Sequence, residues 1–325
     1  MQRAQYASRG PVPQDAIECV EFTLPPLQAG EVLVEVLASP INPSDVLTLT
    51  GEYGMLPPLP AVGGNEGIGR VAAVGEGVAL SVGQRVVLPV GSGTWTSHLV
   101  ARAEALIPLP AEGDIVQLSM LSVNPATASL LLSEFVTLEP GEWVIQNTAN
   151  SAVGRYLIQL AKRRGLRTVN VVRRAEAIAS LEAAGGDVVL VDGPDLPKRV
   201  AEATAKAKIR LGIDATGGLA TDRLARSVAI GGMVVTYGAM SGEACKIAPG
   251  SFVFRDVTLR GFWLAFWFRK ATKAQQQALY GELVQLIAQG ALSAPVHATY
   301  PLSQIKEAVA AAAAGGRDGK IVVVP

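Results

Sequence analysis

The stretch Trp143-Val-Ile-Gln-Asn147, continued by Thr148-Ala-Asn-Ser-Ala-Val-Gly154, decides the fold of this 325-residue chain. Its first part is a short apolar run that predicts a buried strand, and the helical pattern of Val153–Arg164 follows closely. A tight turn between a strand and a helix directs the free N–H groups and the positive dipole end of the helix toward a pyrophosphate. The stretch therefore predicts a dinucleotide-binding unit.

The glycine fingerprint of this turn is incomplete. Ala149 and Ser151 stand where the first two glycines of GxGxxG belong, and Gly154 is the one that remains. A plain helix start, with Asn150 or Ser151 as its N-cap, is the alternative interpretation, because such caps are common.

The end of the next predicted strand indicates which nicotinamide cofactor is used. The run Thr168–Val172 leads into Arg173 and Arg174, in the region where NAD enzymes carry a carboxylate for the ribose hydroxyls. Two guanidinium groups can bind a 2′-phosphate, and no carboxylate stands at the strand end to repel it. The pair favours NADPH, with a solvated basic loop as the alternative.

Short apolar runs alternate with helical segments throughout this part of the chain, which predicts βαβ units and a parallel sheet. The predicted strands are Trp143–Asn147, Thr168–Val172, Val188–Val191, Leu211–Ala215 and Met233–Tyr237, and the predicted helices are Val153–Arg164, Ala175–Ala184, Leu196–Lys206, Ala220–Ala229 and Lys273–Gln289. The fold class is α/β, with a Rossmann-type doubly wound parallel sheet in residues 119–295.

Residues 1–118 form the first predicted domain, and from Glu31 to about Pro110 they show a different pattern, in which short strand-like runs are separated by glycine and proline. This pattern is all-β, and two late strand-like runs suggest that residues 296–325 return to complete this domain. The predicted strands are Val32–Leu37, Gly69–Val74, Arg85–Val90, His98–Ala101, Ala298–Pro301 and Ile321–Val324.

Composition and charge exclude several classes of function. Lysine plus arginine equals aspartate plus glutamate at 28 each, so no basic field is present for nucleic acid or an anionic membrane. No apolar run approaches the roughly 20 residues of a membrane span. The two cysteines and two histidines are too scattered to assemble a zinc site, so no metal is expected; they are Cys19, Cys245, His98 and His297. The cysteine usage and the lack of a signal peptide favour a cytoplasmic location.

Several long motifs resemble those of one family. The segments are Ile41-Asn-Pro-Ser-Asp45, Gly51-Glu-Tyr-Gly54, Leu59-Pro-Ala-Val-Gly-Gly-Asn-Glu-Gly67, Gly93-Thr-Trp95, Val123-Asn-Pro-Ala-Thr-Ala128, Ile145-Gln-Asn147, Thr236-Tyr-Gly-Ala-Met240 and Leu259-Arg-Gly-Phe-Trp-Leu264. Over nearly the whole chain they resemble the mitochondrial 2-enoyl thioester reductases and their bacterial relatives, in the zinc-free quinone oxidoreductase-like branch of the medium-chain dehydrogenase/reductase superfamily. The resemblance implies a GroES-like β domain beside the Rossmann domain.

The resemblance also implies the site residues. Tyr53 corresponds to the active-site tyrosine, and Trp263 shapes the pocket beside the nicotinamide. Without the resemblance, a loop tyrosine such as Tyr53 would be interpreted as a surface or packing residue. The implied NADPH contacts are Asn124, Thr127, Ser151, Ala152, Val153, Gly154, Arg173, Arg174, Tyr237, Gly238, Ala239, Met240, Phe262, Leu264 and Lys320.

The implied reaction is reduction of the α,β double bond of an enoyl thioester, carried on coenzyme A or on acyl carrier protein. Hydride goes to the β-carbon, and the Tyr53 hydroxyl, or a water that it holds, gives a proton to the α-carbon. Two alternatives remain open: an NADPH:quinone or small-enone reductase on the same scaffold, and a non-catalytic NADPH-binding regulator. The family pairs Rossmann sheets edge to edge, which implies a homodimer with Thr258–Phe262 as the edge strand.

Overall fold

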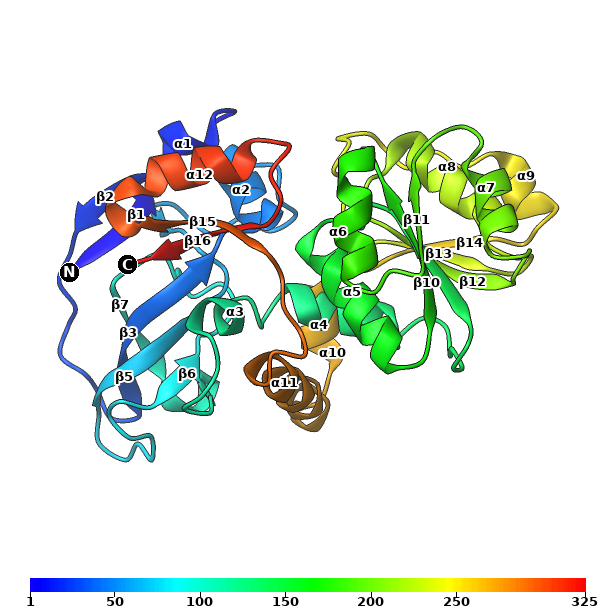
Figure 1. Cartoon of the computed structure of the whole chain (residues 1–325). Helices are drawn as coiled ribbons and strands as arrows, with labels where there is room; N and C mark the ends of the chain where they lie inside the picture. The colour runs from blue at the N-terminus through cyan, green and yellow to red at the C-terminus, as the bar shows by residue number, and fades with distance from the viewer. The chain divides into compact units, whose positions relative to one another are not determined.

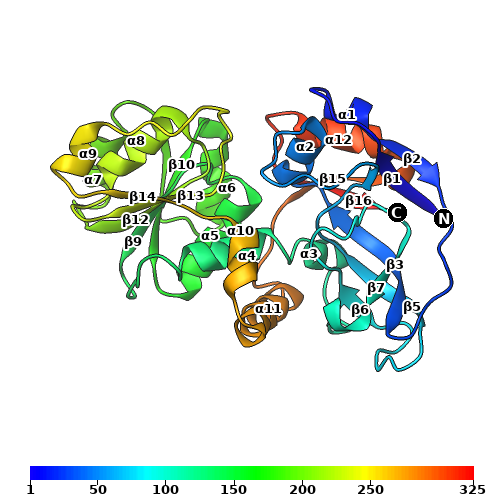
Figure 2. The same ribbon diagram turned by 180° about the vertical axis from the view of Figure 1, so that it is seen from behind.

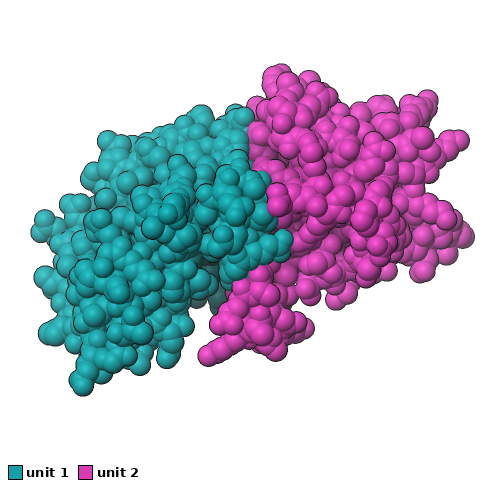
Figure 3. All heavy atoms as spheres, turned by 60° about the horizontal axis from the view of Figure 1, so that its bottom comes forward, with its two compact units in different colours: residues 1–123, 280–325 teal, residues 124–279 magenta.

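The computed structural model describes all residues from Met1 to Pro325, and they form two compact units (Figure 1). Figure 3 colours unit 1, residues 1–123 and 280–325, and unit 2, residues 124–279. The sequence places its domain divisions after residues 118 and 295 instead, and those limits remain a prediction. No helix of the chain is both long enough and apolar enough to cross a bilayer.

Unit 2 is built around a six-stranded parallel sheet with the order β11-β10-β9-β12-β13-β14 (Figure 2). In this order the chain starts at a middle strand and winds outward in both directions, so the predicted doubly wound sheet is confirmed. The strands are β9 (Trp143–Gln146), β10 (Arg167–Val172), β11 (Val188–Val191), β12 (Ile209–Asp214), β13 (Met233–Thr236) and β14 (Thr258–Gly261). The helices are α4 (Asn124–Leu131), α5 (Ala152–Arg163), α6 (Ile178–Ala183), α7 (Leu196–Ala203), α8 (Gly218–Ser227), α9 (Pro249–Val253) and α10 (Leu264–Lys270), with a 3-10 turn η2 (Ala175–Ala177).

Helices bury both faces of this sheet. On one face Ile145 belongs to a core cluster with Leu196 of α7 and Leu224 of α8. On the other face the cluster includes Ile158 of α5 and Leu181 of α6, the two helices that Figure 1 shows on the same side of the sheet. Because both faces are covered, the ends of the strands are left for a ligand, and in sheets of this type ligands bind at the carboxyl ends.

Unit 1 is largely antiparallel. Its larger sheet has the order β15-β16-β3-β5-β6-β8 with β7 paired to β3, and its smaller sheet has the order β2-β1-β4. Antiparallel pairing of β16 with β3 makes the end of the chain part of this sheet. The strands are β1 (Gln2–Tyr6), β2 (Glu18–Glu21), β3 (Glu31–Pro40), β4 (Ala61–Val62), β5 (Ile68–Val74), β6 (Arg85–Val87), β7 (His98–Arg102), β8 (Ile107–Pro108), β15 (Val296–Pro301) and β16 (Lys320–Val324). The helices are α1 (Pro13–Ala16), α2 (Pro43–Thr50), α3 (Ile115–Ser119), α11 (Lys273–Ala288) and α12 (Ile305–Ala313), with 3-10 turns η1 (Ala103–Ala105) and η3 (Leu302–Gln304). The boundary between unit 2 and the second part of unit 1 falls within α11, between Leu279 and Tyr280.

Helix α2 interrupts a region that the sequence pattern predicts as all-β, and there the prediction is wrong. Asn42 and Asp45 form a capping box at its start, and Pro43 supplies a preset φ at the first helical position. Gly51 ends the helix with a φ of 87°, in the left-handed region that glycine tolerates. All three signals can be read from the sequence, so the local chemistry outweighs the surrounding strand pattern.

Candidate active site

The turn between β9 and α5 has the geometry that a dinucleotide needs. Ser151 is the N-cap of α5, and its hydroxyl accepts a hydrogen bond from the N–H of Gly154 at 3.1 Å. A Cβ on Gly154 would lie 2.4 Å from the carbonyl oxygen of Ala149, so only glycine lets the helix pass this close to the turn. This close helix–strand packing is the task of the third glycine in the fingerprint, and the turn therefore fits a pyrophosphate despite its incomplete sequence.

Polar contacts fix this turn to the neighbouring loop between β12 and α8. Thr148 has a φ of 50°, which is unusual for a β-branched residue, and its hydroxyl lies 2.8 Å from that of Thr216. Asn147 donates from Nδ2 to Asp214 Oδ1 at 2.5 Å and accepts from the N–H of Ala215 at 2.7 Å. The carboxyl ends of β9 and β12 are thus held as one polar surface.

Residues from the end of β13 join the same surface. The hydroxyl of Tyr237 is hydrogen-bonded to the side chain of Ser151, and burial raises the pKa of Tyr237 although that bond opposes the change. Met240 donates its N–H to the carbonyl of Ala215 at 2.9 Å, while its side chain is exposed. A Cβ on Gly238 would lie 3.2 Å from the same carbonyl, so the chain here runs tightly against β12.

The other predicted contacts of unit 2 lie on α4, after β10 and at the start of α10. Asn124 and Thr127 are buried in α4, which packs on α5. Arg173 and Arg174 follow β10 with exposed side chains. At the start of α10 lie the predicted residues Phe262, Trp263 and the buried Leu264. The ring of Phe262 packs edge-to-face on Phe135, with 5.8 Å between ring centroids. The ring of Trp263 packs edge-to-face on Phe266, with 4.9 Å between centroids.

Tyr53 belongs to unit 1, where it lies in the loop after α2. Its N–H donates to the carbonyl of Leu47 at 3.1 Å, which ties the loop to the last turn of the helix. The side chain of Tyr53 is half-buried, and the neighbouring Gly54 and Met55 are exposed. The loop therefore holds the tyrosine on a fixed backbone within reach of solvent.

Lys320, the other predicted site residue of unit 1, lies in a buried polar cluster. Its ammonium donates to the carbonyl of Ile41 at 3.1 Å and to Asn42 Oδ1. Asn42 Nδ2 donates in turn to Glu66 Oε1 at 2.7 Å, and the Asn42 N–H donates to Asp45 Oδ2 at 2.7 Å. Burial lowers the pKa of Lys320 to about 8 and raises the pKa of Asp45 to about 7, although in each case the opposite charges nearby counteract it.

The sequence predicts a structural role for Glu66, in holding loops, and assigns neither Glu66 nor Asn42 to the site. Glu66 is fully buried, burial raises its pKa, and its Oε2 accepts from the N–H of Val123 at 2.8 Å. The hints in the sequence are that both residues lie in motifs shared with the family and that Glu66 is a carboxylate in an otherwise uncharged segment. In the structure the cluster anchors the start of α2 and the start of β16 to each other.

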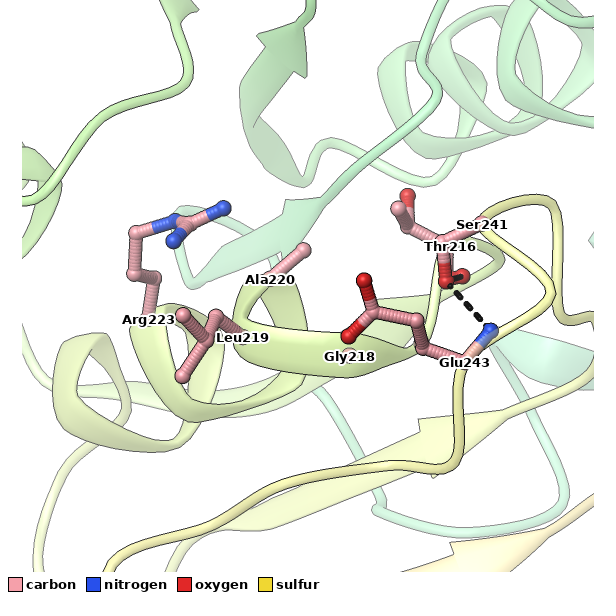
Figure 4. A pocket seen from close by; sticks show the side chains of 8 residues that line it. Thr216, Gly218, Leu219, Ala220, Arg223, Ser241 and Glu243 are labelled. Carbon is pink, nitrogen blue, oxygen red and sulfur yellow. Dashed lines mark hydrogen bonds between the residues drawn. The ribbon is translucent and has the colours of Figure 1, made fainter.

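A pocket of about 210 Å³ opens at the start of α8 in unit 2 (Figure 4). Figure 4 shows the Glu243 side chain over the first turn of α8, and the Glu243 N–H donates to the hydroxyl of Ser241 at 3.1 Å. Ligand pockets commonly measure about 300–1,000 Å³, so this pocket alone is too small for a dinucleotide with an acyl thioester. Its lining residues are Thr216, Gly217, Gly218, Leu219, Ala220, Arg223, Ser241 and Glu243, which include none of the predicted site residues.

No group of three or more histidine, cysteine, aspartate or glutamate side chains in the chain is arranged to hold a metal ion.

Two family models match the chain. Residues 28–111 match the alcohol dehydrogenase GroES-like domain, and residues 152–280 match the zinc-binding dehydrogenase domain. The GroES-like match lies within unit 1, and the dehydrogenase match lies within unit 2 except for its last residue.

Curated relatives and solved structures agree with these models. The mitochondrial enoyl-(acyl-carrier-protein) reductase of Rattus norvegicus is 38% identical over 94% of this chain and 84% of its own length, and that of Homo sapiens is 38% identical over 92% and 82%. The solved complex of Etr1p with NADP and crotonyl-CoA has a TM-score of 0.90 at 27% identity and covers 100% of this chain and 99% of its own. A protein described as an NADPH:quinone reductase from Bacillus thuringiensis has a TM-score of 0.91 at 29% identity, over 100% and 98% of the two chains. The chain therefore belongs to the mitochondrial-type enoyl thioester reductases of the medium-chain dehydrogenase/reductase superfamily, as its motifs predict.

Proposed function

We propose that this protein is an NADPH-dependent reductase of the α,β double bond of enoyl thioesters. The observation that carries the proposal is the β9–α5 turn, in which the close approach at Gly154 and the Ser151 cap fit a pyrophosphate, within a chain 38% identical to enoyl reductases. The Etr1p neighbour is described with NADP and crotonyl-CoA, which supports the same cofactor and substrate class here.

The residues that would hold NADPH follow from the strand ends of unit 2. The first turn of α5 offers N–H groups to the pyrophosphate, and the exposed Arg173 and Arg174 can bind the 2′-phosphate with charge-assisted hydrogen bonds. Lys320 is the proposed contact from unit 1, and its ammonium already donates to the carbonyl of Ile41 and to Asn42 Oδ1. When bound, the reduced nicotinamide supplies a hydride for the β-carbon of the substrate. The full proposed set of contacts is Asn124, Thr127, Ser151, Ala152, Val153, Gly154, Arg173, Arg174, Tyr237, Gly238, Ala239, Met240, Phe262, Leu264 and Lys320.

The chain's own contribution to the chemistry is charge stabilisation and proton transfer. As the double bond is reduced, negative charge gathers on the thioester oxygen, and preorganised donors stabilise it. The proposed proton donor to the α-carbon is the Tyr53 hydroxyl, directly or through a water. Trp263 would shape the pocket beside the nicotinamide, and the edge-to-face contact with Phe266 helps to orient its indole.

The assembly we propose is a homodimer. Strand β14 pairs only with β13 and forms an edge of the parallel sheet, which leaves its other side for a second copy. Close to it in sequence, Val253 is 72% exposed and Phe254 is 82% exposed, as expected for residues covered by a partner. A neighbour at 28% identity is an Etr1p/Etr2p heterodimer from Candida tropicalis, which supports association within the family.

The cytoplasmic location and the choice between coenzyme A and acyl carrier protein remain predictions, and the curated relatives named above are mitochondrial.

An acceptor panel tests the proposed function. NADPH oxidation is followed at the nicotinamide absorbance with crotonyl-CoA, crotonyl-acyl carrier protein, 1,4-benzoquinone and a small enone, each also with NADH. We expect kcat/KM to be highest for an enoyl thioester with NADPH. Faster turnover of the quinone would favour the second candidate, a quinone reductase, which the Bacillus thuringiensis neighbour supports. Binding of NADPH without turnover of any acceptor would indicate a regulator.

A further inference from the structure

Two amide side chains lie inside the parallel sheet of unit 2. Gln146 on β9 is 1% exposed and Asn170 on β10 is fully buried, and the two residues are direct partners in the strand register. Strands covered by helices on both faces are normally apolar, because a buried amide is unfavourable unless hydrogen bonds replace its water. The pair therefore needs an explanation beyond filling the core.

The hydrogen bonds of the pair lead to the first turn of α5. Gln146 Nε2 donates to Asn170 Oδ1 at 2.8 Å and to the carbonyl of Gly154 at 3.0 Å. Asn170 Nδ2 donates to Thr168 Oγ1 at 2.9 Å and to the carbonyl of Val188 at 3.2 Å. These bonds define the orientation of both amides, since turning Gln146 over would place its oxygen against two acceptors.

One atom of the pair is left unsatisfied. Gln146 Oε1 is buried and has no hydrogen-bond partner. An orphaned buried acceptor is costly, so an apolar side chain would serve a purely structural core better. The contact that only the glutamine can make is the bond from its Nε2 to Gly154.

We propose that Gln146, oriented by Asn170, is a positioning residue for the cofactor, and this inference rests on the proposed function. Ala149 and Ser151 replace two of the three fingerprint glycines, and a Cβ on Gly154 would lie 2.4 Å from Ala149 O. The bond from Gln146 holds the helix at this close approach. It thereby sets the direction of the N–H groups that bind the pyrophosphate.

The test is the affinity for NADPH of Gln146→Met, which keeps the volume of the side chain and removes both donors. The dissociation constant is measured by fluorescence titration, and kcat at saturating NADPH with crotonyl-CoA. The variant loses the bonds to Asn170 and to Gly154, and loss of the Gly154 bond, at ordinary strength, predicts a roughly 3- to 10-fold weaker affinity, with kcat nearly unchanged. The control is Thr204→Val, which removes a buried hydroxyl bond to the carbonyl of Val200 on α7 and should leave the affinity for NADPH as in the wild type.

Asn170→Leu gives a second and independent measurement, because it leaves Gln146 in place but removes the group that orients it. We expect a smaller loss of affinity, and almost no additional loss when Asn170→Leu is combined with Gln146→Met. Wild-type affinity in Gln146→Met, or additive losses in the double variant, would overturn the inference while the proposed function stands. Failure of the wild-type protein to bind NADPH would overturn both.

Discussion

Gly154→Ala probes the dinucleotide turn most sharply, because its effect can be worked from one contact. The added Cβ would lie 2.4 Å from the carbonyl oxygen of Ala149, and an ordinary contact begins near 3.4 Å, so α5 must move by about 1 Å. The obstructing atom belongs to the backbone of the turn, so no side-chain rotation can relieve the clash. Overpacking of this kind costs about 1–3 kcal/mol of stability.

The same displacement carries the helix N-terminus away from the pyrophosphate. Loss of one hydrogen bond to the charged pyrophosphate costs about 1.5–3 kcal/mol, so we expect the dissociation constant for NADPH to rise about 10- to 100-fold. The assay is a fluorescence titration with NADPH, with urea unfolding of the same preparation to measure stability.

The matched control is Gly281→Ala within α11. Nothing lies within 4 Å of a Cβ at this position, so the same chemical change meets open space. Alanine is a better helix former than glycine by about 1 kcal/mol, and the control should be slightly more stable with unchanged NADPH affinity. If Gly154→Ala bound NADPH as tightly as the control, the assignment of the β9–α5 turn to the pyrophosphate would be wrong.

Three further variants test other parts of the site. Tyr53→Phe should lower kcat with crotonyl-CoA by roughly 10²- to 10⁴-fold while NADPH still binds, because a general acid is lost, and unchanged turnover would remove Tyr53 as the proton donor. The double variant Arg173→Gln with Arg174→Gln should raise KM for NADPH by about 10-fold or more and leave KM for NADH unchanged. An equal rise in KM for NADPH and for NADH would exclude binding of the 2′-phosphate by this pair. Lys320→Met tests the buried cluster through pH: burial lowers the pKa of Lys320 from 10.5 to about 8, so between these values the folded chain holds fewer protons than the unfolded chain. The free energy of unfolding of the wild type should therefore rise, relative to that of Lys320→Met, by up to roughly 3 kcal/mol as the pH increases from 8 to 10.5. If the difference in unfolding free energy between the two proteins stayed constant over this range, the lowered pKa of Lys320 would be contradicted.

The sequence predicts the Rossmann-type unit well because its signals are local. Val188–Val191 is both the predicted and the observed strand β11, and the predicted run Trp143–Asn147 differs from β9 only at its last residue. An apolar run between helical segments is sufficient evidence for a buried parallel strand. Unit 1 is harder to predict, because short capping signals such as the Asn42–Asp45 box lie within a strand-rich pattern.

The polar contacts inside the two units could not be predicted in the same way. Lys320 and Asn42 lie 278 positions apart, and only the pairing of β16 with β3 brings their backbones near each other. Gln146 and Asn170 appear in the sequence as ordinary strand residues, because their interaction depends on the register between β9 and β10. The roles of Tyr53 and the NADPH contacts come from the family resemblance and remain predictions until variants are measured.

The transfer of an isotope tests the central claim most directly. The protein is mixed with crotonyl-CoA and NADPH that carries deuterium at nicotinamide C4 on the transferred face, and the thioester product is analysed by mass spectrometry and NMR. We expect butyryl-CoA with one deuterium at the β-carbon and a solvent-derived hydrogen at the α-carbon. Absence of butyryl-CoA, or a product without deuterium at the β-carbon, would contradict the assignment of this chain as an enoyl thioester reductase.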